Sequence, residues 1–343
     1  MHWTHAHAGS ILSLMGIAVP FPETLPAGYD WFDDEPVFDP ARHLQLEDPT
    51  EILMLADLGY RAKEIAAKAT PVAASSPFRL LSDEGAAIML DVARRLRGFA
   101  TPAGDRIEQM TRGGCYRSRW LRDLSISQDV SDHLEKIYGI EIAPHPMPVH
   151  LGHLNFEPSC IETAIDKWHH DTLPLDYVMA VTDPAEVAGG RFEYFVGTRH
   201  EAAELAAAGK TPPPERTVAP EFPGPGHAIA LHGDMVVHRA GPLTELTERI
   251  SMVNGYVALD TSRDEQSRSA DLIVVDDPEA LYTEWAKFAA WRSQGRLERL
   301  IDELAFGVDP GAVAAELDAA VTEVTRAAAE MRAGAGQMKH YGG

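Results

Sequence analysis

The chain has 343 residues, of which 45% are hydrophobic, so it can bury a sizeable core as one elaborated domain or as two average ones. Its 52 acidic and 30 basic side chains give a formal charge of −22, which opposes binding to nucleic acid. The two cysteines, Cys115 and Cys160, form no Cys-x-x-Cys motif, so the sequence indicates a reduced, cytoplasmic protein without a disulfide framework.

The N-terminal residues 1–47 are predicted to form an extended arm, because they are rich in proline, aromatic and acidic residues. Within the arm, AGSILSLMGIAVPF resembles the core of a signal peptide. No lysine or arginine precedes it, and this argues against secretion. No apolar run in the sequence approaches the ~20 residues of a membrane-spanning helix, so no membrane association is expected.

Residues 48–145 are predicted to be a mostly helical region that packs on the core. Three segments support this prediction: DPTEILMLADLGYRAKEIAAKA with Asp48 as its cap, SDEGAAIMLDVARRLRGFA with Ser82 as its cap, and SQDVSDHLEKIYG ending at Gly139.

Residues 146–262 are predicted to be the β core. Strand candidates follow one another between Gly, Pro and Asp turns: PVHLGHLNFEP, DYVMAVTD, GRFEYFVG, GHAIALHG and RISMVNGYVAL. Many short strands favour a barrel or a jelly roll over a parallel sheet. An insertion at 200–216, with a short helical pattern and a proline run, is expected to be a surface excursion or a lid.

Residues 263–343 are predicted to be a C-terminal helical extension. Two long helical patterns occupy 278–307 and 309–334, the second opened by Asp309 and Pro310, and the ending QMKHYGG is expected to be frayed. Trp285 and Trp291 stand at helical spacing and indicate core or subunit contacts. The extension is compatible with a homodimer formed through these helices.

The segment KWHHD is a candidate metal site at the mouth of a strand. Alternate residues of a strand share a face, so His169 and Asp171 can point the same way while His170 points elsewhere. His238, in LHGDMVVHRAGP, lies far downstream and therefore on another strand. Two histidines and one carboxylate form a facial triad that leaves metal positions open.

Arg249 is the second part of the candidate site. It follows His238 after the turn AGPLTE, and a hairpin would bring it back beside the metal. With Ser251 on the same strand face, its planar guanidinium can hold a carboxylate in a bidentate manner. A metal triad with a carboxylate clamp is what a 2-oxoglutarate-dependent iron oxygenase needs.

The series WHHD, AGGRFEYFVGTR, GHAIALHGDMVVHRAG and RISMVNGY, between residues 147 and 257, resembles the Fe(II)/2-oxoglutarate dioxygenase superfamily. Within it, the motifs are most similar to the group of free amino-acid hydroxylases and halogenases. The resemblance implies a double-stranded β-helix, iron bound by His169, Asp171 and His238, and 2-oxoglutarate bound by Arg249 and Ser251. Asn155, on the preceding strand, is expected to contact 2-oxoglutarate or substrate.

The implied activity is the O2-dependent hydroxylation of an unactivated C–H bond in a small molecule, such as an amino acid, with release of succinate and CO2. The halogenases replace the carboxylate ligand by a small residue, and this chain keeps Asp171, so hydroxylation is the expectation. Another metal-dependent cupin-type enzyme, an isomerase or a dioxygenase without 2-oxoglutarate, is the alternative. A non-catalytic protein with a vestigial barrel is the third interpretation.

Other residues could carry chemistry, and each has a plainer interpretation. His170 could be a ligand, but its position on the strand conflicts with that of Asp171. His232 and Asp234 repeat the His-x-Asp pattern in a turn, without a usable later histidine. In the basic run RGGCYRSRWLRD, one arginine could reach a substrate carboxylate, although ion pairing with the acidic excess explains the run equally.

Overall fold

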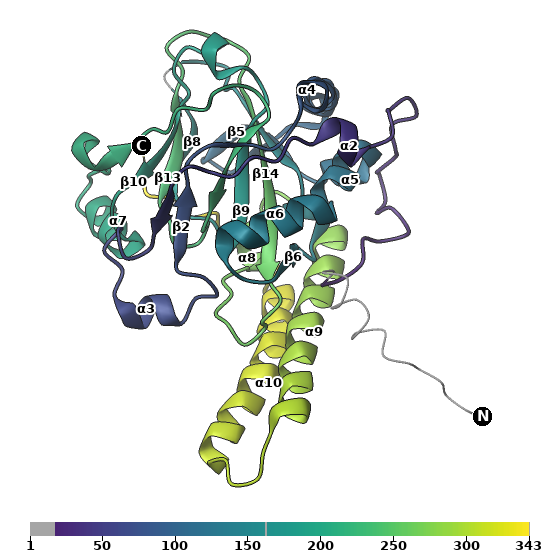
Figure 1. The fold of residues 1–343 in the computed structure, drawn as a ribbon, viewed down its shortest axis with the longest axis vertical. Helices are drawn as coiled ribbons and strands as arrows, with labels where there is room; N and C mark the ends of the chain where they lie inside the picture. Colours follow the sequence, from purple (N-terminus) through teal and green to yellow (C-terminus); the bar gives the residue numbers. More distant parts are fainter. Residues whose placement is uncertain (1–17, 162, 343) are drawn as a thin grey trace.

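The computed structural model of the protein describes residues 18–161 and 163–342, which include two antiparallel sheets (Figure 1). The larger, ten-stranded sheet has the order β1-β2-β12-β9-β14-β7-β5-β4, with β3 paired to β12 and β6 paired to β14. Its strands are β1 (Ile52–Met54), β2 (Val72–Ser75), β3 (Phe78–Arg79), β4 (Thr101–Ala103), β5 (Ile107–Thr111), β6 (Ile142–Pro144), β7 (His153–Phe156), β9 (Leu175–Ala180), β12 (His227–Leu231) and β14 (Ile250–Ala258).

The smaller sheet has four strands in the order β11-β10-β13-β8. They are β8 (Ala164–His169), β10 (Phe192–Phe195), β11 (Thr217–Val218) and β13 (His238–Pro242). From β7 to β14 the chain passes repeatedly between the two sheets, which together form a double-stranded β-helix. The predicted fold class is therefore confirmed.

All nine residues of β14, in the middle of the larger sheet, are buried. This strand is paired to β9 on one edge and to β7 and β6 on the other. A strand covered on both faces shows no alternation of polar and apolar residues. The predicted strand segments at 148–158, 176–183, 190–197, 226–233 and 249–259 each contain one of the observed strands.

Two of the predicted N-terminal helices are confirmed. Helix α4 (Asp83–Leu96) begins after Ser82, whose hydroxyl accepts a hydrogen bond from the Gly85 amide. Helix α6 (Gln128–Tyr138) ends at Gly139, which has a φ of 69° and closes the helix in the left-handed conformation. The shorter helices are α2 (Pro40–His43), α3 (Ala62–Ala66), α5 (Arg119–Ser125) and α8 (Ser269–Leu272).

The long helix predicted from Asp48 onwards is wrong. Its apolar run instead forms β1, which pairs with β2, and only Ala62–Ala66 is helical. Leu55 and Leu58, next to β1, are buried in a cluster with Val236 and Leu231, so tertiary packing overrides the local helical pattern. The region 48–145 is likewise not mostly helical, because it adds strands β1 to β6 to the larger sheet.

The insertion at 200–216 contains the predicted helix, α7 (Arg199–Ala207). Its Ala202 packs against Trp168, Phe195 and Val237 of the smaller sheet and its flank. Because Trp168 precedes His169 in the same strand, this contact lies on the face of the sheet opposite to His169. The helix therefore covers the outside of the barrel.

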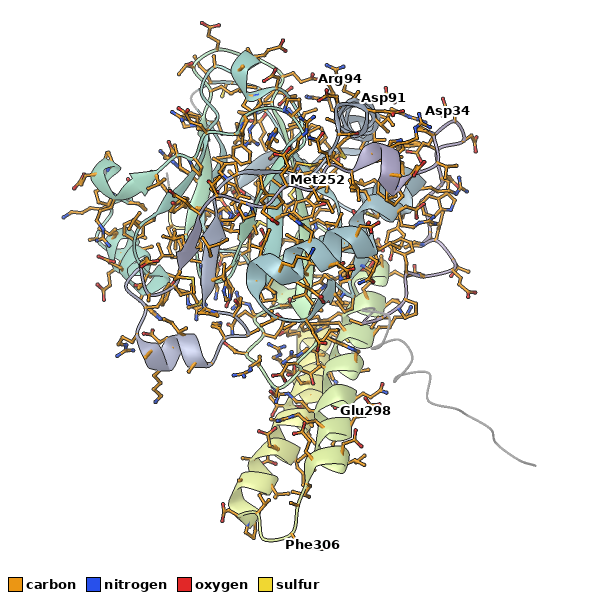
Figure 2. All side chains as sticks on the ribbon, in the orientation of Figure 1. Asp34, Asp91, Arg94, Met252, Glu298 and Phe306 are labelled. Carbon is orange, nitrogen blue, oxygen red and sulfur yellow. The ribbon has the colours of Figure 1, made fainter. Side chains whose placement is uncertain are left out.

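The two predicted C-terminal helices are confirmed as α9 (Pro278–Glu303) and α10 (Pro310–Ala333), which form a hairpin that projects from the barrel (Figure 1). Trp285 is buried near the barrel, whereas Ile301 and Phe306 are exposed, Phe306 at the tip of the hairpin (Figure 2). The homodimer through these helices stays a prediction. Among the described residues, no helix is both long and apolar enough to cross a membrane.

The C-terminal tail is not frayed, contrary to the prediction. The Tyr341 amide donates to the Trp168 carbonyl at 2.5 Å, and the Trp168 amide donates to the Gly342 carbonyl at 3.1 Å. β8 is the edge strand of the smaller sheet, so the tail occupies an edge whose backbone groups would otherwise lack partners. The signal-like segment of the predicted arm lies largely outside the described residues.

Candidate metal centre

The sheet pairing brings together the three residues that the sequence singled out. His169 is the last residue of β8 and His238 the first residue of β13, and they are direct partners in the antiparallel ladder. Asp171 lies two residues beyond the end of β8. One ligand atom from each residue lies within 4.8 Å of the other two, and no other such group of His, Cys, Asp and Glu occurs in residues 18–161 and 163–342.

Backbone carbonyls orient both imidazole rings. Nδ1 of His169 lies 2.6 Å from the Lys167 carbonyl, and Nδ1 of His238 lies 3.1 Å from the Val236 carbonyl. A carbonyl only accepts, so each Nδ1 carries the proton and each Nε2 keeps a free lone pair. The two Nε2 atoms lie 3.3 Å and 3.4 Å from different oxygens of Asp171.

The protonation states of His238 and Asp171 also favour the binding of a cation. Burial, together with the neighbouring His169, lowers the pKa of His238 to about 4, so its ring is neutral at pH 7. Burial alone would raise the pKa of Asp171, but His238, His169 and Arg106 hold the pKa of this carboxyl well below its usual range. Imidazole nitrogens and a carboxylate are donors that suit a divalent transition metal.

Asp166 and Arg106 support the triad from behind, and sequence reasoning missed both. Arg106 donates to the two oxygens of Asp166 at 2.6 Å and 2.8 Å, and Asp166 lies 3.4 Å from Nδ1 of His169. An irregularity in the β8–β13 ladder pairs His238 with His169 but Ala240 with Asp166. This bulge brings Asp166 to the face that holds His169, although the two residues are three apart.

Arg249 reaches the site by a route different from the predicted hairpin. β13 belongs to the smaller sheet and β14 to the larger one, so the chain crosses the barrel between His238 and Arg249. Arg249 and Ser251 line the same inner cavity as the triad. The guanidinium therefore approaches this cavity from the opposite sheet.

The Arg249 guanidinium is buried and held by neutral groups. It donates to the Ser251 hydroxyl at 2.6 Å and to the Gly190 carbonyl at 3.2 Å. Gly190 has a φ of 60°, and a Cβ there would lie within 2.9 Å of Leu243 and Ile165 side-chain atoms, so only glycine allows this approach. Among the described residues, no carboxylate pairs with Arg249, and burial lowers its pKa to about 10.

Asn155 lies where the sequence placed it. It pairs with Ser251 across β7 and β14, it lines the inner cavity, and its buried Oδ1 has no hydrogen-bond partner among the described residues. The inner cavity measures about 30 Å³. A neighbouring cavity of about 400 Å³ shares Arg249, Ser251, Val178 and Phe192 with it, so these residues lie between the two spaces.

The competing candidates have structural roles. His170 lies outside the triad, and its Nδ1 is 2.6 Å from the Tyr341 hydroxyl. His232 is 3.2 Å from Asp234, which is also paired with Lys68 at 2.5 Å. This second His-x-Asp pattern therefore belongs to a buried ion-pair network.

The four arginines of the basic run RGGCYRSRWLRD lie in two different environments. Arg117, Arg119 and Arg122 lie over aromatic rings, those of Tyr29 and Phe99 for Arg117 and that of Trp31 for the other two. Arg112 is buried instead, and its Nε donates to Asp276 at 2.7 Å. Of the four arginines, only Arg112 lines a cavity next to the triad.

In comparisons with known proteins, no family model and no curated protein matches the sequence. Solved structures with a similar fold include the non-heme alpha-ketoglutarate-dependent carbocyclase SnoK from nogalamycin biosynthesis, with 18% identity over 62% of this chain and 88% of SnoK and a TM-score of 0.41. The epimerase SnoN from the same biosynthesis has 18% identity over 52% of this chain and 75% of SnoN, with a TM-score of 0.39.

EctD from S. alaskensis, solved with 2-oxoglutarate and 5-hydroxyectoine, has 18% identity over 70% of this chain and 87% of EctD, with a TM-score of 0.37. At such identities and TM-scores the similarity does not extend to activity or substrate.

Proposed function

We propose that the protein is an Fe(II)- and 2-oxoglutarate-dependent oxygenase that acts on a small molecule. The observation that carries the proposal is one cavity with two features, a metal-ligand triad and a buried arginine without a carboxylate partner. A metal-binding jelly roll of another kind needs the first feature only. The second requires an anionic group near the metal.

The residues fit an iron ion. His169 and His238 each direct Nδ1 to a backbone carbonyl and leave Nε2 for a metal, and Asp171 is ionised. Three protein ligands on one side of an ion leave its other positions open. Bound iron would supply the O2-dependent oxidation, with succinate and CO2 as co-products.

The residues also fit a dicarboxylic keto acid. A buried, unpaired guanidinium is costly in free energy, and a carboxylate that binds to it offsets this cost. Arg249, with Ser251, would bind the distal carboxylate, and the unpartnered Oδ1 of Asn155 lines the same space. The inner cavity of about 30 Å³ is too small for the whole keto acid, so Phe192 or Val178 would move to admit it.

Within this class we favour hydroxylation of an amino acid or a related metabolite. Asp171 fills the position whose loss would open a site for chloride, and the motifs resemble those of free amino-acid hydroxylases. Burial of His169 and His238 limits the access of bulk water to the metal site. Desaturation and ring formation are alternatives that use the same residues.

The test has two stages. Anaerobic addition of Fe(II) and 2-oxoglutarate is expected to give the weak visible charge-transfer band of the chelate. A screen that starts with free amino acids is then scored by O2-dependent succinate formation and by product mass. A protein that binds Fe(II) but gives neither the band nor succinate would be a metalloenzyme of another kind.

A further inference from the structure

A third cavity, of about 50 Å³, lies on another side of Asp171. It shares Arg106, His153 and Asp171 with the inner cavity and no residue with the 400 Å³ cavity next to Arg249. A ligand bound there would therefore lie near the metal ligands without occupying the site proposed for 2-oxoglutarate.

The wall of this cavity holds buried polar atoms that lack partners among the described residues. Nη2 of Arg112, both ring nitrogens of His150 and Nδ1 of His153 form no hydrogen bond. The Arg112 side chain is 9% exposed, and His150 is 2% exposed. Leaving buried polar atoms without partners is costly, so a set of them around one cavity indicates a missing polar ligand.

The free groups include donors. Burial lowers the pKa of His153 to about 3 and that of His150 well below its usual range, so each neutral ring offers one N–H and one acceptor nitrogen. Nη2 of Arg112 adds donors that carry positive charge. Several donors that converge on one small space suit an oxyanion, and a carboxylate above all.

The charge of the wall favours the same ligand. Four basic side chains, Arg106, Arg112, Arg268 and Lys339, and two acidic ones, Asp171 and Asp271, line the cavity. Arg106, Arg112 and Arg268 are paired with Asp166, Asp276 and Asp271, although Nη2 of Arg112 keeps no partner. Lys339 has no ion pair among the described residues. In a protein of charge −22, this concentration of basic groups is local.

The rest of the wall is apolar and includes Ile107, Met110, Leu173, Leu272 and Met338. At about 10–15 Å³ for each water-sized occupant, the cavity holds only a few heavy atoms. It therefore accommodates the polar end of a small molecule and a short hydrocarbon segment.

We infer that this cavity is the substrate subsite and that it binds the carboxylate of a small organic acid through Arg112, His150 and His153. That the bound acid is the substrate rests on the proposed function, whereas the binding of a carboxylate in this cavity does not depend on it. Met338 and Lys339 place the C-terminal tail in the wall of the subsite.

The test is isothermal titration of the full-length protein with acetate and propanoate, with acetamide and propanamide as neutral controls. An Arg249→Gln background removes the competing anion site, and the protein is kept free of metal because a metal ion on the triad would itself bind the acids. We expect the acids to bind at least tenfold more tightly than the amides. Arg112→Gln should remove this preference, whereas Arg119→Gln, in the same basic run but away from the cavity, should keep it.

Lys339→Gln is a second variant that does not threaten folding, because Lys339 is exposed. It should weaken propanoate binding about two- to fivefold and leave amide binding unchanged. Equal affinity for acids and amides, or a preference that survives in both Arg112→Gln and Lys339→Gln, would overturn the inference. Acid binding in this titration, with no succinate formed by the Fe(II)-loaded wild type in the substrate screen, would contradict the proposed function. It would not contradict the carboxylate subsite.

Discussion

The hydroxyl of Tyr341 lies 2.6 Å from Nδ1 of His170, the residue between the two candidate metal ligands His169 and Asp171. The same tail residue pairs with Trp168 through its backbone amide. The end of the chain is therefore attached to the strand that carries the metal motif, and it closes one side of the cavity in which we place the substrate.

Removal of residues 335–343 is expected to open this cavity. The Trp168 amide would lose its acceptor, the Gly342 carbonyl, so hydrogen exchange in the peptide that contains Trp168 should accelerate at least tenfold. Exchange in β14, at the centre of the larger sheet, should not change. A truncated protein with unaltered exchange at Trp168 would mean that the tail does not hold β8 in solution.

His238→Ala is expected to reduce affinity for Fe(II) or Co(II) by about 100-fold or more, because it removes one of three ligands. His170→Gln is the matched control, since it changes the neighbouring histidine on the same segment and leaves the triad complete. Titration with Co(II), followed by its visible absorption, measures both variants. Equal losses in the two variants would refute the assignment of the ligands.

Asp166→Asn is expected to weaken metal binding by about 10- to 100-fold, although Asp166 is not a ligand in our assignment. The change removes the charge that Arg106 contacts at 2.6 Å and that helps to orient the His169 ring. The freed Arg106 would also compete for Asp171, from which it lies 3.7 Å away. Asp105→Asn, on the exposed neighbour of Arg106, should leave the Co(II) titration unchanged.

Arg249→Gln should raise the apparent KM for 2-oxoglutarate at least 30-fold and leave metal affinity nearly unchanged, because the guanidinium contacts no metal ligand. Arg239→Gln is its control: Arg239 lines the same cavity but is paired with Glu193 at 2.6 Å. Steady-state rates of succinate formation at varied 2-oxoglutarate concentrations distinguish the two variants. A KM that rises equally in both variants would remove the special role of Arg249.

The same variant makes a prediction about stability. Burial lowers the pKa of Arg249 to about 10, so in the absence of an anion its charge destabilises the folded state. Without ligand, Arg249→Gln should therefore unfold at an equal or higher temperature than the wild type. Saturating 2-oxoglutarate should stabilise the wild type and not the variant, as thermal scans would measure.

The spacing of side chains predicted the centre of the site but not its surroundings. His169, Asp171, His238 and Arg249 follow from the order of the motifs, although Asp171 lies beyond the end of β8 and Arg249 reaches the cavity from the opposite sheet. Arg106 lies in the turn between β4 and β5, where the sequence has no recognisable motif. Asp166 faces the site only because of a bulge, which the residue pattern does not encode. Such contacts depend on how distant strands pair.

Two errors have a similar physical cause. The run after Asp48 has helical periodicity, yet it pairs as β1 with β2 because the larger sheet offers it an edge and a buried cluster. The tail QMKHYGG has the composition of a frayed end, yet the free edge of β8 binds it. In both cases a sheet edge that lies outside the segment itself decides the conformation.

Acid is expected to destabilise the protein through its buried histidines. Burial lowers the pKa of His145 and His153 to about 3, and that of His170 and His238 to about 4, from a usual value of 6.5. Below pH 6.5 the unfolded chain therefore takes up more protons than the folded one at these sites. Their contribution to stability is complete above pH 6.5 and is lost as the pH falls towards 4, by up to about 1.4 kcal/mol per pH unit for each histidine.

Glu284 acts in the opposite direction, because burial raises its pKa to about 8 and the folded state binds its proton first. The histidine effect is therefore best isolated in a comparison of the wild type with His170→Gln, by urea unfolding at pH 7.5, 6.5, 5.5 and 4.5. The variant lacks one of the depressed pKa values, so its free energy of unfolding should fall less steeply below pH 6.5. The difference in slope should vanish above pH 7, and parallel curves down to pH 4.5 would mean that the His170 ring is already accessible to protons in the folded protein.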